Sequence, residues 1–183
     1  MNILEPAQAG AQLLSLVVFA SIAKWYVAPW LVRQPRATAL IALLWVHVFR
    51  YVALQVYSAR LGGFPISAQG AREIVIGDVG GAILAFAAIL LLRSRIRFGI
   101  AASWLLALET GYDTITNIKG GVREHLMGAA SGVTWLTLVF FVPAIVVSAG
   151  LLAWQLYSRR GETLGQDHGR PAASASAPRS ATA

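Results

Sequence analysis

The sequence predicts an all-α fold, a polytopic membrane bundle of five transmembrane helices. Of its 183 residues, 57% are hydrophobic and 13% are charged, which is about half the charged share of a typical soluble domain. The hydrophobic residues also fall into runs of roughly 20, the length that an α-helix needs to cross a bilayer. Short loops, several of them rich in arginine, separate these runs. A water-soluble fold is therefore not expected.

The first two helices are predicted at residues 11–32 and 37–58. Pro29 is expected to kink or end the first of them, because proline has no N–H to donate within a helix. The residues before this helix contain Glu5 and no lysine or arginine, unlike the positively charged start of a secretory signal peptide. We therefore expect the first helix to be retained as a membrane span.

The other three helices are predicted at residues 74–92, 98–118 and 132–157. The second half of the fourth helix is polar, so it must face protein or water rather than lipid. The fifth contains Pro143, where a kink is expected. Residues 161–183 are rich in alanine, serine, glycine and proline and are predicted to form a flexible cytoplasmic tail. The bundle itself then occupies residues 1–160.

The distribution of positive charge predicts the orientation of the bundle. Five helices place the two termini on opposite sides, and the connections on one side carry seven arginines: Arg33, Arg36, Arg93, Arg95, Arg97, Arg159 and Arg160. The connections on the other side carry four cations: Arg60, Arg72, Lys119 and Arg123. The side richer in lysine and arginine normally faces the cytoplasm. We expect the N-terminus outside and the C-terminus in the cytoplasm.

Polar side chains inside the predicted helices define a candidate binding site for a substrate or ion. Its members are His47, Arg50, Asp78, Glu109, Tyr112 and Asp113. At about 1.5 Å of rise per residue, the ionisable ones lie ~7–18 Å below the outer surface. Their common depth, on three different helices, predicts that they meet in the outer half of the bilayer.

Helical spacing also predicts how these groups pair. His47 and Arg50 are three residues apart, and Glu109 and Asp113 are four apart, so each pair shares one helix face. An ionised group near the bilayer centre costs ~2.5–3.5 kcal/mol or more. We therefore expect Arg50 to pair with Asp78 or Glu109. The excess of carboxylates over cations suggests that one of the acids holds a proton at neutral pH.

The sequence identifies no cofactor, and metal binding is a weaker interpretation of the site. The chain has no cysteine, which excludes disulfides and thiolate metal ligands. His47, Glu109 and Asp113 are chemically suited to several divalent ions, but no metal-binding spacing connects them. A haem is disfavoured because the other two histidines lie in an outer loop and in the tail.

A resemblance adds a location to these predictions. The run His47-Val48-Phe49-Arg50 in the second helix, followed by Gly77-Asp78 in the third, resembles small uncharacterised bacterial multi-pass integral membrane proteins. The resemblance implies the bacterial cytoplasmic (inner) membrane and brings no activity with it.

Three functional hypotheses remain open. The first is a protein that binds or transports a small molecule or ion, with proton coupling, through the outer polar site. The second is a membrane enzyme that uses the same acids for acid–base or metal chemistry. The third is a non-catalytic subunit or assembly factor. The expected partners are the lipid bilayer, a small molecule or ion, and further copies or subunits. Nucleic acid is not expected, because no basic face is interleaved with aromatic residues.

Overall fold

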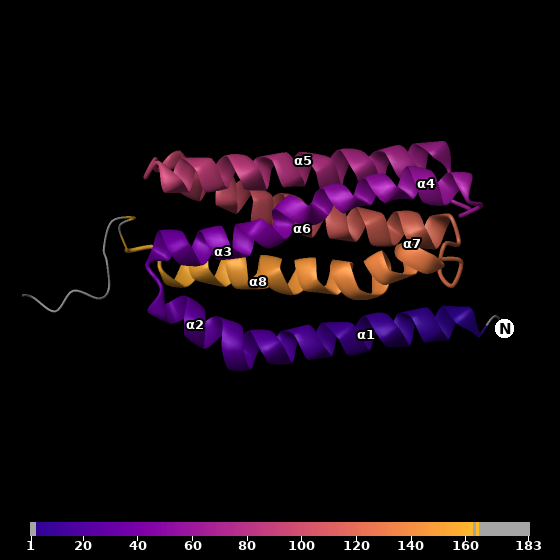
Figure 1. Ribbon diagram of the computed structural model, residues 1–183, viewed down its shortest axis with the longest axis horizontal. Helices are drawn as coiled ribbons and strands as arrows, with labels where there is room; N and C mark the ends of the chain where they lie inside the picture. Colours follow the sequence, from indigo (N-terminus) through magenta and orange to yellow (C-terminus); the bar gives the residue numbers. More distant parts are fainter. Residues whose placement is uncertain (1–2, 163, 165–183) are drawn as a thin grey trace, which may run out of the picture.

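The computed structural model describes residues 3–162 and 164, and the regular structure in this part of the chain is helical throughout. The helices form elongated rods that lie side by side and connect at alternating ends (Figure 1). The first described residues lie at one end of the bundle and Ser158, where the last helix stops, lies at the other. The all-α prediction is confirmed.

The first and last rods each contain a π-helical turn that ends two residues before a proline. The first rod consists of α1 (Leu4–Ile22), a π turn (Ala23–Val27) and α2 (Ala28–Arg33). The last consists of α7 (Gly132–Leu136), a π turn (Thr137–Phe141) and α8 (Val142–Ser158). Pro29 and Pro143 lack the N–H that a regular ladder requires, and the wider turn accommodates that loss. Pro29 does not end its helix, although the first rod bends where α1 passes into α2 (Figure 1).

The second rod changes its helical type at its centre. It consists of α3 (Arg36–Val48), a 3₁₀ segment (Phe49–Leu54) and α4 (Gln55–Leu61). A 3₁₀ stretch in the middle of a helix often marks a functional or strained position. Here it begins one residue before Arg50.

The third and fourth rods are α5 (Ala68–Arg93) and α6 (Phe98–Arg123), which are unbroken helices. All of the rods correspond to predicted helices, but several extend further than predicted. The first starts at Leu4 rather than residue 11, and α5 starts at Ala68 rather than residue 74. Of the predicted tail, residues 161, 162 and 164 are described and the remainder lies outside the described residues.

Four helices are long and apolar enough to cross a membrane. They are Leu4–Arg33, Arg36–Leu61, Ala68–Arg93 and Gly132–Ser158. The fourth rod, α6, has a comparable length but is not among them. Its C-terminal half contains Glu109 and Asp113, which lower its hydropathy. Apolar composition therefore supports four spans, and a fifth depends on what faces the polar half of α6.

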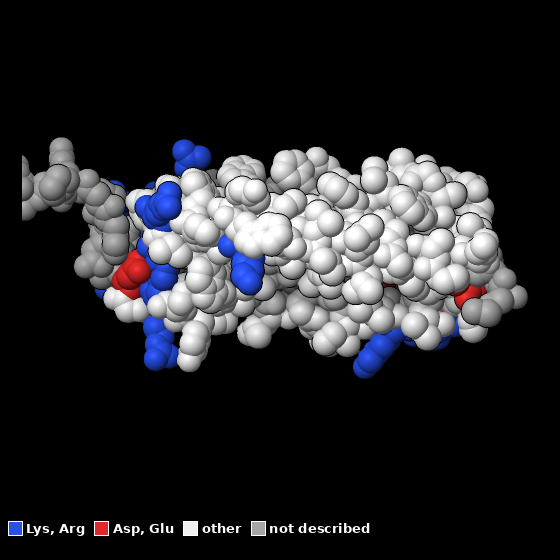
Figure 2. Space-filling model, turned by 90° about the horizontal axis from the view of Figure 1, so that it is seen from below, with Lys and Arg blue, Asp and Glu red and all other residues white. Residues whose placement is uncertain are grey.

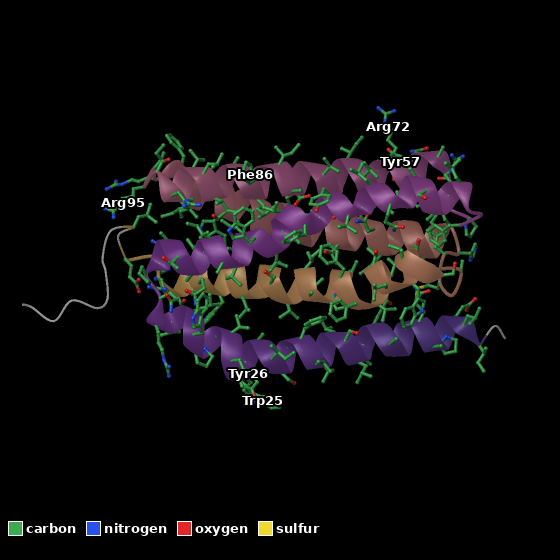
Figure 3. The ribbon with its side chains drawn as sticks, viewed as in Figure 1. Trp25, Tyr26, Tyr57, Arg72, Phe86 and Arg95 are labelled. Atoms are coloured by element: carbon green, nitrogen blue, oxygen red, sulfur yellow. The ribbon has the colours of Figure 1, made fainter. Side chains whose placement is uncertain are left out.

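Charge and apolar surface are separated along the length of the bundle. Large apolar side chains such as Ile83, Phe86 and Leu90 are exposed on α5, and Figure 3 shows Phe86 at its surface. Figure 2 shows most lysine and arginine side chains toward one end, with a broad band of uncharged surface before the other end. An apolar belt between charged ends matches the layers of a bilayer.

Candidate functional site: a buried arginine among three carboxylates

Arg50 lies at the centre of the polar site. Its side chain is 1% exposed, and it projects from the 3₁₀ segment of the second rod between α5 and α6. The surrounding acids are Asp78, ten residues after the start of α5, and Glu109 and Asp113 on α6. Helical rise places Asp78 ~15 Å from the N-terminal end of α5. This distance lies in the upper part of the depth range of ~7–18 Å predicted from the sequence. The cluster is this far from the helix ends because the helices extend further than predicted.

Every N–H group of the Arg50 guanidinium has an acceptor. The Nε group donates to Asp78 Oδ1 at 2.8 Å. The Nη1 group donates to Glu109 Oε2 at 2.6 Å and to Thr110 Oγ1 at 3.1 Å. The Nη2 group donates to Glu109 Oε1 at 3.2 Å and to Asp113 Oδ2 at 2.8 Å. A guanidinium has five N–H donors, so Arg50 has none left for a ligand.

The structure therefore unites pairings that the sequence offered as alternatives. Asp78 and Glu109 both bind Arg50, and Asp113 binds it as well. Their side chains are 18%, 25% and 13% exposed, respectively. Three carboxylates around one guanidinium leave an excess of negative charge, and this excess lies on side chains that are partly exposed at the surface of the bundle.

Two glycines of α5 provide the space for this cluster. A Cβ atom at Gly81 would lie 2.7 Å from Arg50 Cζ and closer still to Nη1. A Cβ atom at Gly77 would lie 3.0 Å from Asp113 Cγ. Such separations are shorter than normal van der Waals contacts between carbon atoms. Glycine at both positions lets α5 approach Arg50 and α6 closely, as small residues do at membrane helix interfaces.

Two polar residues of α6 complete the cluster. Asn117 Nδ2 donates to Asp113 Oδ2 at 3.1 Å, as the four-residue spacing predicts. Thr110, which the sequence analysis missed, accepts from Arg50 and is 2% exposed. The sequence feature that could have identified Thr110 is its position beside Glu109 and three residues before Asp113 in a polar half-helix.

Two predicted members behave differently from expectation. Tyr112 lies outside the cluster: its residue is 72% exposed, and its hydroxyl has no hydrogen bond among the described residues. It is adjacent to Asp113 on α6 and is rotated from it by about 100° around the helix axis, and the structure places it at the surface rather than in the cluster. His47 is completely buried, and neither of its ring nitrogens has a hydrogen-bond partner among residues 3–162 and 164.

The metal interpretation receives no support from this geometry. Within the described residues, no group of three or more histidine, cysteine, aspartate or glutamate side chains is arranged to hold a metal ion. Glu109 and Asp113, the predicted carboxylate ligands, are bonded to Arg50 instead. The candidate site is thus an ion-pair cluster.

A carboxylate outside the cluster also connects α5 and α6, near the bundle end that contains the loop before α5. Glu124 follows α6 beside His125, where a solvated loop pair is expected from the sequence. Its carboxylate instead accepts from Ser67 N at 2.7 Å and Ser67 Oγ at 2.8 Å. The Ser67 backbone N–H, its hydroxyl and the nearby Arg123 cation together lower the pKa of Glu124. Ser67 also caps α5 by accepting from Gly70 N at 2.9 Å.

Fold and site together define the class of this protein. It is an all-helical protein with four helices fit to cross a membrane, and three of its rods share a buried ion-pair cluster. The chain belongs to the family described as domain of unknown function DUF8737, whose model matches residues 8–157. No curated protein and no solved structure matches the chain.

Proposed function

We propose that this protein is an integral membrane protein that binds and exchanges a proton, or another small cation, at the carboxylates around Arg50. The observation that carries the proposal is the contrast between the arginine and its acids. Arg50 is buried and fully engaged, so it cannot receive an anionic ligand without losing a carboxylate. The three acids outnumber Arg50 and are partly exposed. A ligand that binds to these carboxylates is therefore expected to carry positive charge.

The cluster is suited to binding a proton, because protonation can neutralise one carboxylate without breaking the hydrogen bonds of Arg50. An ionised carboxylate in a poorly solvated site is costly, and neighbouring carboxylates repel one another. Glu109 contacts Arg50 through both of its oxygens, while Asp113 contacts it through one. Asp113 also accepts from Asn117. Protonation at the oxygen of Asp113 that faces away from Arg50 would leave both of these bonds possible.

An open cavity lies at the end of the bundle opposite the arginine-rich connections, and its lining does not include the cluster residues. It measures about 330 Å³ and is lined mainly by small and uncharged residues of α4, α7 and the adjoining loops. Gln55 lies at its wall, five residues after Arg50 on the second rod. Thr134 of α7 donates to Gln55 Oε1 at 3.1 Å.

The same geometry favours α6 as a fifth membrane span. Its polar half faces Arg50 and α5 with the very carboxylates that lower its hydropathy, so lipid need not contact them. Five spans place the arginine-rich connections on one side, which the positive-inside rule assigns to the cytoplasm. The proposed location is the bacterial cytoplasmic membrane, with the N-terminus outside.

Reporter fusions test this topology. Alkaline phosphatase is active only outside the cytoplasm, so fusions after Gly63 and Gly128 should be active and a fusion after Arg95 inactive. These positions lie in the connections between rods. The reverse pattern would overturn the orientation. Activity after Gly63 with inactivity after Gly128 would show that α6 does not cross the membrane.

Infrared spectroscopy and liposome flux test the proposed proton exchange. The purified wild-type protein should show the carbonyl band of a protonated carboxyl that disappears as pH rises through neutrality. Liposomes containing the protein should also pass protons when a potential is imposed. Glu109→Gln and Asp113→Asn should alter the band and reduce flux to that of protein-free liposomes.

The matched control is Glu73→Gln, which changes a surface acid of α5 whose side chain is 55% exposed. It should leave both the band and the flux unchanged. Wild-type flux that persists in Glu109→Gln and Asp113→Asn would contradict the proposal, as would a spectrum in which all three acids stay ionised down to acidic pH.

A structural role is the second candidate, and the complete saturation of Arg50 favours it. A guanidinium with every donor satisfied can serve solely to fix how the helices pack. In that case the protein would be a non-catalytic subunit of a membrane complex. Loss of folding in Arg50 variants, together with no flux in the wild type, is the result that would distinguish it.

A further inference from the structure

The arginine end of the bundle is a second charged region, on the opposite side of the membrane belt from the connection that contains Glu124. We define it by seven residues: Arg33, Arg36, Arg93, Arg95, Arg97, Arg159 and Arg160. Among the acids that the structure describes, Glu162 is the one that pairs with a member of this set, bonding Arg159 at 2.6 Å. Figure 2 shows the positive charge concentrated at this end. The region therefore attracts anions.

Two buried side chains at this end each have a donor group without an acceptor among the described residues. Arg36 is 4% exposed and donates through Nη1 to Glu162 O at 2.7 Å, but its Nε atom has no hydrogen-bond partner within the described part of the chain. Gln155 is completely buried, and its Nε2 atom also has no hydrogen-bond partner in the residues that the structure describes. Its Oε1 atom accepts from Arg159 Nη1 at 3.3 Å. Buried donors are normally satisfied, so within the described residues this end has fewer acceptors than its buried donors need.

Five of the arginines are exposed at the height where apolar helices end. They are Arg33, Arg93, Arg95, Arg97 and Arg160, and none has an ion-pair partner among the described residues. Arg93 ends α5, and Arg97 precedes α6. The phosphates of a bilayer lie at the ends of its spanning helices, where basic residues gather and attract anionic lipids.

Arg95 occupies a backbone position that favours glycine. Its φ is 57°, and the connection around it is a Schellman turn in which Ile96 N donates to Leu91 O at 2.9 Å and Arg95 N donates to Leu92 O at 3.0 Å. The left-handed residue of this turn is usually glycine. An arginine there is a strained choice for the backbone, so its presence is better explained by its side chain. Figure 3 shows that side chain extending from the end of the bundle.

We propose that the arginine end binds the headgroup of an anionic phospholipid, with Arg95 and Arg97 as principal contacts for its phosphate. Charge complementarity selects the ligand: guanidinium groups form strong, paired hydrogen bonds with phosphate oxygens. The connection from Arg93 to Arg97 brings three guanidinium-bearing residues into five positions between two spanning helices. This site is separate from the acid cluster and does not depend on the proposed proton exchange.

The test uses the full chain in a neutral detergent, titrated with short-chain phosphatidylglycerol, with phosphatidylcholine of the same chain length, or with inorganic phosphate. Binding is read by native mass spectrometry and by the shift in unfolding temperature. Phosphatidylglycerol should bind and stabilise the protein, and phosphatidylcholine should not. Arg95→Gly should weaken phosphatidylglycerol binding about fivefold, the typical contribution of one arginine near an anionic surface. Adding Arg97→Gln to Arg95→Gly should weaken phosphatidylglycerol binding further.

Matched controls separate charge from turn geometry. His125 has a φ of 55° in the same kind of turn after α6, at the other end of the bundle, so His125→Gly makes the same backbone change away from the arginine end. Arg72, labelled on α5 in Figure 3, is an exposed arginine near the other end of that helix. His125→Gly and Arg72→Gln should both bind phosphatidylglycerol as the wild type does.

Three results would overturn the proposal. The first is equal binding of phosphatidylglycerol and phosphatidylcholine. The second is wild-type affinity in both Arg95→Gly and Arg95→Gln, the second of which preserves a side chain in the turn. The third is inorganic phosphate that binds as tightly as phosphatidylglycerol and displaces it, which would show a site for free anions rather than for lipid.

Discussion

Replacing Arg50 with methionine is expected to destabilise the protein by about 3–5 kcal/mol, the cost of leaving buried charges without their partner. Methionine fills a similar volume but donates no hydrogen bonds. Asp78, Glu109 and Asp113 would then face one another without the cation that binds all three. Equilibrium unfolding in detergent, monitored by circular dichroism, measures the loss.

Two companion variants make this experiment decisive. Arg50→Lys keeps the charge but has fewer donors and no planar fork, so it should retain part of the stability. Adding Glu109→Gln to Arg50→Met removes one unpaired carboxylate and should recover part of the loss. Wild-type stability in Arg50→Met would contradict the central role of this arginine. A double variant that is less stable than Arg50→Met would contradict the argument from unpaired charge.

Replacing Gly81 with alanine is expected to cost about 1–3 kcal/mol, the range for overpacking a filled interior. The new Cβ atom would meet Arg50 Cζ at 2.7 Å and Glu109 Oε2 at 3.1 Å. The guanidinium cannot retreat easily, because every one of its donors is bonded. We therefore expect α5 to move away from the cluster. A lower unfolding temperature and, under the proposed function, reduced proton flux would report this movement.

The neighbouring glycine provides a matched control. Apart from the adjoining backbone of α5, a Cβ atom at Gly80 would have no heavy atom of the described residues within 4 Å. Gly80→Ala should therefore be neutral or stabilise the helix by up to about 1 kcal/mol, since glycine weakens a helix interior relative to alanine. Equal stability of Gly80→Ala and Gly81→Ala would show that α5 and Arg50 are not in close contact.

Much of the site was accessible from spacing and depth alone. The four-residue interval between Glu109 and Asp113 places both on one face, and that face meets Arg50 in the structure. The cost of charge in a bilayer predicted that Arg50 would pair with Asp78 or Glu109. The prediction stopped at a choice between these acids, because one sequence does not say how many helices surround a given side chain.

Other features depended on contacts that no local pattern reports. Tyr112 belongs to the same polar half-helix as Asp113 but faces outward, at 72% exposure. Glu124 has the sequence context of a solvated loop, yet it binds the N-terminal cap of α5. His47 shares a helix face with Arg50, but its ring nitrogens have no hydrogen-bond partner in the described part of the chain. Each outcome depends on which surface a neighbouring rod presents.

By itself, the sequence determined the all-helical composition of this protein, the approximate position of each helix and the concentration of arginine at one end. These properties follow from hydropathy, helical periodicity and chain connectivity, which are local or additive along the chain. Tertiary structure alone decided that one guanidinium binds three carboxylates, that Gly77 and Gly81 make room for them and that Glu124 joins two helices. The rotation of each rod about its axis selects these contacts, and that rotation is fixed only when side chains from distant segments pack together.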